Sequence, residues 1–339
     1  MLHTKNIKSL KSRIDVSKTK ETVLSNSVAV TGAAGFIGGQ TMIALQAAGY
    51  KVLGIDKAKL PANLKDYADY FMQEDYASSY ALDAIYRHQP LAIIHCGGTS
   101  LVGPSMKDPA GYYHNNFVKT KTLLDHVVKQ RLKSKIIFSS SAAVYGEPDH
   151  VPCAESDVPA PVSPYGDSKF MIEMMLRSYG RAYGLSWNAF RYFNVCGADP
   201  KAQHGQRDGA THIIARILES IRDGREFVLN GDDYDTEDGS CIRDYVHVAD
   251  VAAVHVRALN TDFVNGVYNV GINQGISNRE IMDAAERITG QKLKITVGPR
   301  RPGDPARLQA DAGQLEAQGW QAQHGLDDMV THAWKWYVR

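Results

Sequence analysis

A tyrosine and a lysine stand four residues apart at Tyr165 and Lys169, in the run Tyr-Gly-Asp-Ser-Lys that follows Pro164. In a helix this spacing places the phenol and the ammonium on one face. A phenol, with an ordinary pKa of about 10, acts as a base at neutral pH only where positive charge stabilises its phenolate. Lys169 and an oxidised nicotinamide together would supply that charge. The pair therefore predicts proton abstraction beside a nicotinamide, although an exposed tyrosine–lysine pair has the same spacing.

A run of three serines, Ser139 to Ser141, begins at the last residue of the apolar segment 135–139 and extends beyond it. If that segment is a parallel strand, the serines lie at its carboxyl end, where ligands of α/β sheets collect. A hydroxyl at this position can share or relay a proton with a tyrosine. We therefore predict that Ser141 works beside Tyr165.

Three glycines, Gly32, Gly35 and Gly38, follow a β-branched run at 27–31 and extend into the start of a helix-like stretch at 36–48. Glycines in such a turn let the backbone approach a pyrophosphate, whose charge is favourable at the helix N-terminus. A second predicted strand, 51–55, is followed by Asp56, near the spacing of a carboxylate that binds adenosine ribose hydroxyls. This carboxylate would repel the 2′-phosphate of NADP. The pattern predicts NAD, whereas the glycines alone would also suit a plain strand–helix turn.

The elements that must position these groups alternate along the chain. Apolar runs at 91–95, 135–139 and 186–191 are separated by helical stretches at 81–87, 112–129 and 165–183. Such alternation predicts an α/β fold, a doubly wound parallel (Rossmann) sheet with a smaller mixed α/β substrate-binding domain. We assign 27–193 to the NAD-binding domain, which 243–272 rejoins, and we assign 194–242 and 273–339 to the substrate domain.

Composition narrows the classes of partner. Lys and Arg number 38 against 37 Asp and Glu, for a formal net charge of +1, which predicts no nucleic-acid partner and no anionic membrane. No apolar run approaches the roughly 18 residues of a spanning helix. Four cysteines without CxxC spacing, and twelve histidines without an HxxxH pattern, predict no metal site and a reducing cytoplasmic setting. Residues 1–26 are predicted to form a disordered basic tail rather than a signal peptide.

Taken together, these residues resemble the extended short-chain dehydrogenase/reductase family, within it the nucleotide-sugar 4-epimerases. The resemblance extends from about residue 27 to residue 336. The stretches that carry it are Thr31-Gly-Ala-Ala-Gly-Phe-Ile-Gly38, Asp108-Pro109, Tyr112-Tyr-His-Asn-Asn116, Ser139-Ser-Ser-Ala-Ala-Val-Tyr-Gly146, Ser163-Pro-Tyr-Gly-Asp-Ser-Lys169, Arg191-Tyr-Phe-Asn194, Asp235-Thr-Glu-Asp-Gly239, Arg243-Asp-Tyr-Val-His-Val248 and Arg300-Arg-Pro-Gly-Asp304.

The resemblance implies a role for each matched position. Tyr165 would take the proton of the sugar 4-hydroxyl while C4 gives a hydride to NAD, Lys169 would hold the nicotinamide ribose, and Ser141 would bond the sugar oxygen. The implied cofactor-binding residues are Gly32, Gly35, Phe36, Ile37, Gly38, Asp56, Asp75, Asn115, Ser139, Tyr165, Lys169 and Tyr192. The implied UDP-sugar-binding residues are Ser141, Tyr165, Asn194, His212, Val228, Asn230, Arg243, Arg301 and Asp304. The diphosphate's two charges suit the arginines, which are planar donors.

The family also implies a homodimer formed through the helices at 112–129 and 165–183, with Leu123, Leu124, Val127, Met174 and Leu176 among the apolar residues that would supply the face. The same pattern would arise from packing against the chain's own sheet.

Two positions depart from the family pattern and leave the sugar open. Ser100 stands where a lysine often binds cofactor phosphate, and Leu308 is intermediate between the bulky and the small residues that decide N-acetyl tolerance. UDP-glucose/UDP-galactose is the predicted substrate pair, with UDP-pentoses (xylose/arabinose), UDP-GlcNAc or UDP-glucuronate as alternatives. A non-catalytic NAD-binding sensor is the hypothesis of another class, but it would have no reason to keep Tyr165, Lys169 and Ser141 together.

Overall fold

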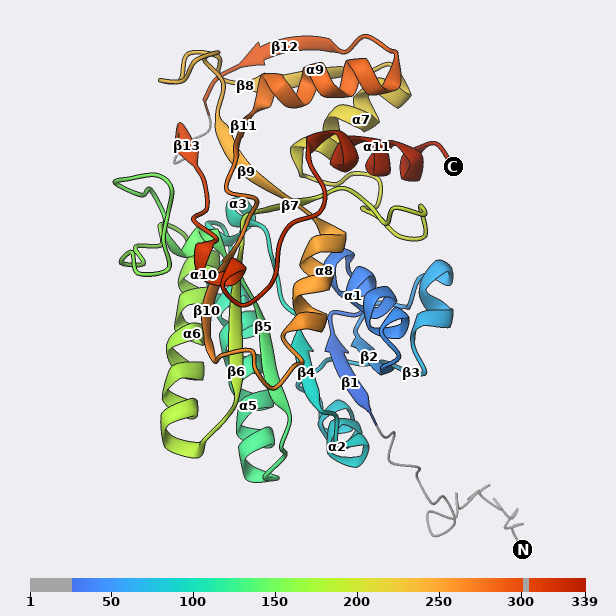
Figure 1. Ribbon diagram of the computed structural model, residues 1–339, viewed down its shortest axis with the longest axis vertical. Coiled ribbons are helices and arrows are strands. Elements are labelled where there is room, and N and C mark those ends of the chain that lie inside the picture. The colour runs from blue at the N-terminus through green and yellow to red at the C-terminus, as the bar shows by residue number, and fades with distance from the viewer. Residues whose placement is uncertain (1–25, 301–304) are drawn as a thin grey trace, which may run out of the picture.

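The main layer of the computed structural model is a sheet of seven parallel strands in the order β10-β6-β5-β4-β1-β2-β3 (Figure 1). The structure describes residues 26–300 and 305–339, so the tail predicted over 1–26 lies outside it apart from Asn26. The order reverses on either side of β1 and β4, which confirms the predicted doubly wound parallel sheet. The strands are β1 (Ser27–Thr31), β2 (Lys51–Asp56), β3 (Tyr70–Gln73), β4 (Ala92–His95), β5 (Lys135–Ser141), β6 (Trp187–Tyr192) and β10 (Gly266–Val270).

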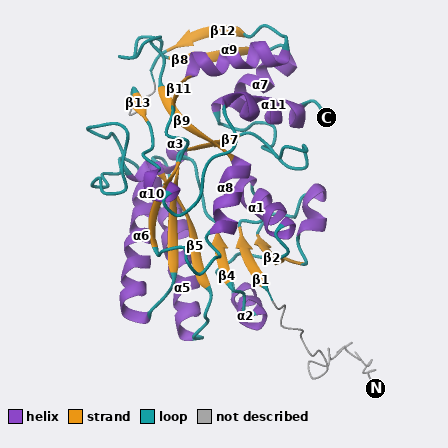
Figure 2. Ribbon diagram, in the orientation of Figure 1, coloured by secondary structure: helices purple, strands orange, loops and turns teal. Residues whose placement is uncertain are grey.

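Both faces of this sheet are buried because its strands are apolar on both sides. In β1, Val28 and Val30 join the core on the α1 and α8 side, whereas Ala29 between them joins the core on the α2, α5 and α6 side. Successive strand residues point to opposite faces, so a strand covered twice needs an unbroken apolar run. The covering helices are α1 (Phe36–Ala47) and α8 (Val248–Arg257) on the first face, and α2 (Ser79–His88), α5 (Lys119–Lys129) and α6 (Pro164–Tyr183) on the second (Figure 2).

A second layer lies beyond the end of β6, which runs almost directly into β7 (Asn194–Cys196) (Figure 1). Its central strand, β9 (Ile242–His247), pairs in parallel with β7 and β13 (Arg307–Leu308) and antiparallel with β11 (Gly275–Ser277). A separate parallel pair joins β8 to β12. The remaining elements are β8 (Glu226–Asn230), β12 (Lys294–Gly298), α7 (Ile213–Asp223), α9 (Asn278–Thr289), α10 (Gly313–Glu316) and α11 (Leu326–Tyr337).

The segment 243–272 is divided between the two layers. Its first part forms most of β9 in the second layer, then α8 packs on α1, and β10 adds an edge strand beside β6. Only the part of this segment from α8 onward therefore rejoins the main layer. Among the described residues, no helix combines the length and apolarity needed to cross a bilayer.

The single helix predicted over 112–129 is divided into three parts. A short α4 (Pro109–Tyr112) leads into a π-helical segment, η2 (Tyr113–Val118), and then into α5. A π segment inserts one residue per turn and turns side chains toward new directions, often at functional sites. Apolar spacing alone does not reveal it. The other short elements are η1 (Ala62–Tyr67), α3 (Val102–Ser105) and η3 (Ala142–Val144).

Candidate active site

The glycine turn between β1 and α1 is packed so closely that side chains do not fit. Gly32 has φ +69°, and a Cβ on it would lie 2.7 Å from the carbonyl carbon of Cys96. A Cβ on Gly38 would lie 2.1 Å from the carbonyl oxygen of Gly32. Gly35 donates its N–H to the same oxygen at 3.0 Å and begins α1 without a side-chain cap. The first N–H groups of α1, from Phe36 and Ile37, are thus suited to an anion.

Charged side chains flank this turn. Asp56 at the end of β2 accepts the N–H of Ala34 at 3.0 Å and that of Ala58 at 2.8 Å, so its carboxylate is held beside the turn. From the second layer, Arg207 donates to the carbonyl oxygen of Ala34 at 3.1 Å. We did not predict Arg207, because it is far from the turn in sequence. A pyrophosphate at the turn would meet both the helix end and this guanidinium.

Asp75 and Asn115, both predicted to bind the cofactor, accept hydrogen bonds from the same lysine. Lys119 Nζ donates to Asp75 Oδ2 at 2.7 Å and to Asn115 Oδ1 at 2.8 Å. Partial burial raises the pKa of the Asp75 carboxyl, but the hydrogen bonds from Lys119 and from the N–H of Ala77, with the charge of Lys119, together outweigh burial and lower the net pKa. The π segment places Asn115 one helical turn before Lys119, which fixes this cluster beside the sheet.

The three residues predicted to do the chemistry come together where β5 ends and α6 begins. Tyr165 is 8% exposed and lies beside Ser141. Lys169 is buried, donates to the carbonyl oxygen of Ser139 at 2.7 Å, and has its Nζ 5.7 Å from the Tyr165 ring centroid. Burial raises the pKa of Tyr165, an effect that the neighbouring Ser141 hydroxyl partly offsets, and burial lowers the pKa of Lys169 to about 8. The protein alone therefore keeps the phenol protonated.

Tyr192 is held by a chain of buried hydrogen bonds whose proton directions can be assigned. Thr41 Oγ1 donates to the carbonyl oxygen of Ile37 at 2.8 Å, so it accepts from His255 Nδ1, also at 2.8 Å. Burial lowers the pKa of His255 to about 3, so the ring is neutral and its Nε2 accepts from the Tyr192 hydroxyl at 2.5 Å. Tyr192 in turn lies 3.1 Å from the hydroxyl of Ser139. This chain links α1 to the serine that anchors Lys169.

A buried ion pair lies beside the serines at the end of β5. Glu173 accepts from Arg191 Nη2 at 2.7 Å and from Ser140 Oγ at 2.5 Å, and both charged side chains are at most 2% exposed. We did not predict Glu173 from the sequence. Its spacing of four residues from Lys169 is the signal that places it on the same face of α6.

Apart from Ser141 and Tyr165, the predicted substrate residues that the structure describes lie in the second layer. Arg243 is buried on β9, opposite Leu308 of β13, and Asn194 of β7 donates to the carbonyl oxygen of Asp244 at 2.9 Å. These three lie on adjoining strands. The other predicted residues are His212, exposed at the start of α7, Val228 and Asn230 on β8, and Arg301 and Asp304, which lie outside the described residues.

Three histidines from distant parts of the chain meet between α8 and α11, although the sequence showed no metal-site pattern. Their ligand atoms all lie within 4.8 Å of one another. His247 Nδ1 accepts the N–H of Ala249 at 3.0 Å, so its Nε2 carries the ring proton and donates to His332 Nδ1 at 3.1 Å. The His247 and His324 rings stack 4.2 Å apart, so their lone pairs do not converge. This donor set forms a hydrogen-bonded cluster and is poorly arranged for a metal.

Comparison with known proteins identifies the family. Residues 28–271 match the model of the NAD dependent epimerase/dehydratase family. The chain belongs to this family. The UDP-glucose 4-epimerase of Halalkalibacterium halodurans is 40% identical over 321 residues, covering 92% of this chain and 95% of that protein. The match confirms the resemblance predicted from the sequence.

Solved structures of epimerases agree with the fold. A UDP-glucose-4-epimerase from Stenotrophomonas maltophila, with bound NAD and formylated UDP-arabinopyranose, is 33% identical with a TM-score of 0.87, covering 92% of this chain and 98% of that one. The UDP-Glc/GlcNAc 4-epimerase of Campylobacter jejuni is 32% identical with a TM-score of 0.79, covering 92% and 99%. NAD, predicted from the glycine turn, is supported as the cofactor by the family match and by such NAD-bound structures.

The glycine turn gives a direct test of cofactor binding in this epimerase-family chain. We expect Gly38→Ala to displace the turn, because the added methyl meets the Gly32 carbonyl, and to lower the NAD content of the purified protein about tenfold or more. Overpacking of this kind costs roughly 1–3 kcal/mol. Gly103→Ala is the matched control, since a Cβ there meets nothing within 4 Å. Equal NAD content in the two variants, measured after denaturation, would contradict the assigned role of the turn.

Proposed function

We propose that this chain is an NAD-dependent UDP-sugar 4-epimerase that interconverts UDP-glucose and UDP-galactose through a transient 4-keto sugar. The observation that carries the proposal is the buried meeting of Tyr165, Ser141 and Lys169 beside the glycine turn, in a chain that belongs to an epimerase family. The reaction produces no net redox change, because the hydride that leaves C4 returns to its other face.

Each group of the site has a defined task in this reaction. Tyr165 takes the proton of the 4-hydroxyl, and Ser141, beside the phenol, orients the sugar oxygen and shares that proton. When bound, NAD supplies the hydride acceptor and a positive charge. Lys169, fixed by Ser139, binds the nicotinamide ribose and adds a second positive charge near the phenol. These charges lower a tyrosine pKa that burial alone raises.

The cofactor is held along the carboxyl ends of the strands. Gly32, Gly35 and Gly38 leave room that a Cβ would fill, the first N–H groups of α1 and Arg207 bind the pyrophosphate, and Asp56 binds adenosine ribose hydroxyls. Asp75 and Asn115, joined by Lys119, and Tyr192 and Ser139 form the rest of the cofactor wall. On the substrate side, Arg243 and Arg301 bind the diphosphate, Asp304 accepts from the uridine ribose, and Asn194, His212, Val228 and Asn230 complete the UDP site.

A UDP-N-acetylhexosamine is the second candidate substrate. Leu308, opposite Arg243 in the sheet, packs on the cluster that contains Phe193 and Tyr145 near the proposed sugar position. A leucine here leaves more room than a bulky aromatic residue. This favours tolerance of an N-acetyl group over strict hexose selection.

The proposal is tested by separate incubations with UDP-glucose, UDP-GlcNAc, UDP-glucuronate and UDP-xylose, followed by chromatographic separation of the epimers. We expect conversion of UDP-glucose to UDP-galactose, at the highest kcat/KM of the four. Conversion of another sugar alone would move the chain to another substrate class. Retention of NAD without conversion of any of them would favour the sensor hypothesis.

We also propose that the chain works as a cytoplasmic homodimer, with 27–193 and the returning segment as its NAD-binding domain and 194–242 and 273–339 as its UDP-sugar domain. Four of the apolar residues predicted for the dimer face pack instead in the chain's own core. They are Leu123, Leu124, Val127 and Leu176. Val118 beside α5 and Met174 on α6 remain 46% and 43% exposed.

Met174 provides the test of this interface. We expect Met174→Glu to convert a dimer into a monomer in sedimentation velocity, because it places an unpaired carboxylate in an apolar contact. Ile295→Glu is the matched control, since Ile295 is also 43% exposed but lies on β12 in the second layer. A monomeric native chain, or a Met174→Glu variant that stays dimeric, would refute the interface.

A further inference from the structure

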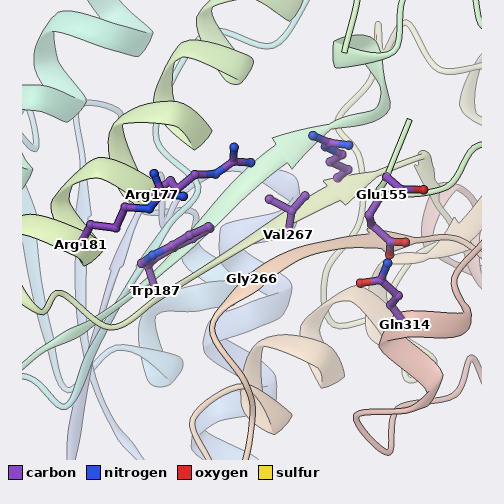
Figure 3. A pocket seen from close by; sticks show the side chains of 9 residues that line it. Glu155, Arg177, Arg181, Trp187, Gly266, Val267 and Gln314 are labelled. Carbon is purple, nitrogen blue, oxygen red and sulfur yellow. The ribbon is translucent and has the colours of Figure 1, made fainter. Parts of the chain in front are cut away.

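A cavity of about 410 Å³ opens at the edge of the main sheet, away from the residues assigned to catalysis (Figure 3). Arg177 and Arg181 of α6 lie on one side of it, and Glu155 and Gln314 lie on the other. Trp187 and Val267 lie between these two sides, and the wall also includes Ser156, Arg191 and Gly266. The cavity therefore has an apolar floor between polar walls.

The wall carries a positive excess, because Arg177 and Arg181 face one glutamate, whereas the charge of Arg191 is balanced by Glu173. Arg177 and Arg181 are exposed and stand one helical turn apart, and neither makes an ion pair or hydrogen bond within 26–300 and 305–339. Elsewhere on the surface, Arg222 pairs with Asp208 and Asp223, and Arg287 pairs with Asp327. Arg177 and Arg181 therefore present two unpaired guanidiniums at one cavity.

The third arginine, Arg191, lies in the core behind the cavity wall. It is 2% exposed, its Nε and Nη2 bind Glu173, and its guanidinium lies 4.8 Å from the centre of the Tyr145 ring. Arg191 therefore forms part of the wall, and the contacts to an anion come from Arg177 and Arg181.

Glu155 limits where an anion can lie. Its Oε1 accepts the N–H of Asn269 at 2.8 Å, which fixes the carboxylate at the wall opposite α6. An anion must therefore lie toward Arg177 and Arg181, leaving the apolar floor and the amide of Gln314 to the rest of the ligand. Guanidinium groups bind phosphate oxygens through paired donors, and two of them match a diphosphate.

We propose that this cavity is a second anion site, which binds a diphosphate group, either free or as part of a nucleotide. The site is separate from the proposed UDP-sugar site. Arg191 and Tyr192 are neighbours on β6 and therefore point to opposite faces of the sheet, and Arg177 follows Lys169 by two helical turns along α6.

The test is isothermal titration of the full chain with sodium pyrophosphate and, in a second arm, with ADP. Saturating NAD and UDP are present throughout, so that the proposed active site is already filled. We expect saturable binding that the double variant Arg177→Gln/Arg181→Gln weakens about tenfold or more, as loss of charged hydrogen bonds implies. The matched control, Arg222→Gln/Arg287→Gln, removes the same net charge from two paired surface arginines and should bind as the native chain does.

The two arms identify the source of the diphosphate. Equal affinity for both probes supports recognition of the diphosphate alone, and tighter binding of ADP supports a nucleotide whose base contacts the apolar floor. The proposal is overturned if neither probe saturates at millimolar concentrations, if the Arg177/Arg181 variant binds normally, or if the control variant loses as much affinity.

Discussion

Tyr165→Phe is expected to lower kcat for UDP-sugar epimerisation by about three orders of magnitude while leaving NAD bound. The substitution removes only the hydroxyl that Ser141 contacts, and a positioned general base contributes roughly 10²–10⁴-fold. A thousandfold loss corresponds to about 4 kcal/mol of transition-state stabilisation. The aromatic ring remains, and so does the bond from Lys169 to Ser139, so cofactor content should not change. Initial rates with UDP-galactose and NAD content after denaturation measure the two effects.

Tyr179→Phe is the matched control for this experiment. Tyr179 lies on the same helix, but its hydroxyl donates to Asp125 of α5 rather than to the proposed active site. Its loss should leave kcat within about twofold of the native value, as for other surface changes. If Tyr165→Phe retained a tenth or more of native kcat, Tyr165 would not be the base.

The parts of the site that could be predicted from the sequence are local in the chain. Gly32, Gly38 and Asp56 fall within one strand–turn–helix–strand unit, so their spacing carries the geometry. Tyr165 and Lys169 share one helix for the same reason. In each case a short segment of regular structure converts spacing along the sequence directly into position in space.

Groups joined across the sheet could not be predicted in this way. His255 reaches Tyr192 and Thr41 only because α8 packs on α1 beside β6, and Arg207 reaches the glycine turn from a loop of the second layer. These contacts depend on strand order and helix packing, which spacing does not encode. The π segment before α5 is hidden for a related reason, since its apolar pattern is that of an ordinary helix.

Glu173→Ala is expected to lower the free energy of unfolding by about 3–5 kcal/mol, the usual effect of removing one partner of a buried ion pair. Arg191 would remain charged at 2% exposure, without the carboxylate that now binds its Nε and Nη2. Ser140 would lose its acceptor as well. Because Ser140 lies between Ser139 and Ser141 on β5, we also expect kcat to fall in the folded variant. Urea unfolding followed by circular dichroism measures the stability, and initial rates below the transition measure kcat.

Two further variants separate the effect of an unpaired buried charge from the effect of lost packing. Asp327→Ala breaks the exposed pair with Arg287 and should cost less than about 1 kcal/mol, because solvent screens it. The double variant Glu173→Met/Arg191→Met should be more stable than Glu173→Ala, since it leaves no unpaired charge in the core. If Glu173→Ala cost no more than Asp327→Ala, water must reach Arg191 in the folded chain. In that case the pair could not hold the serines of β5 in place, and their positions would depend on backbone hydrogen bonds to β6 alone.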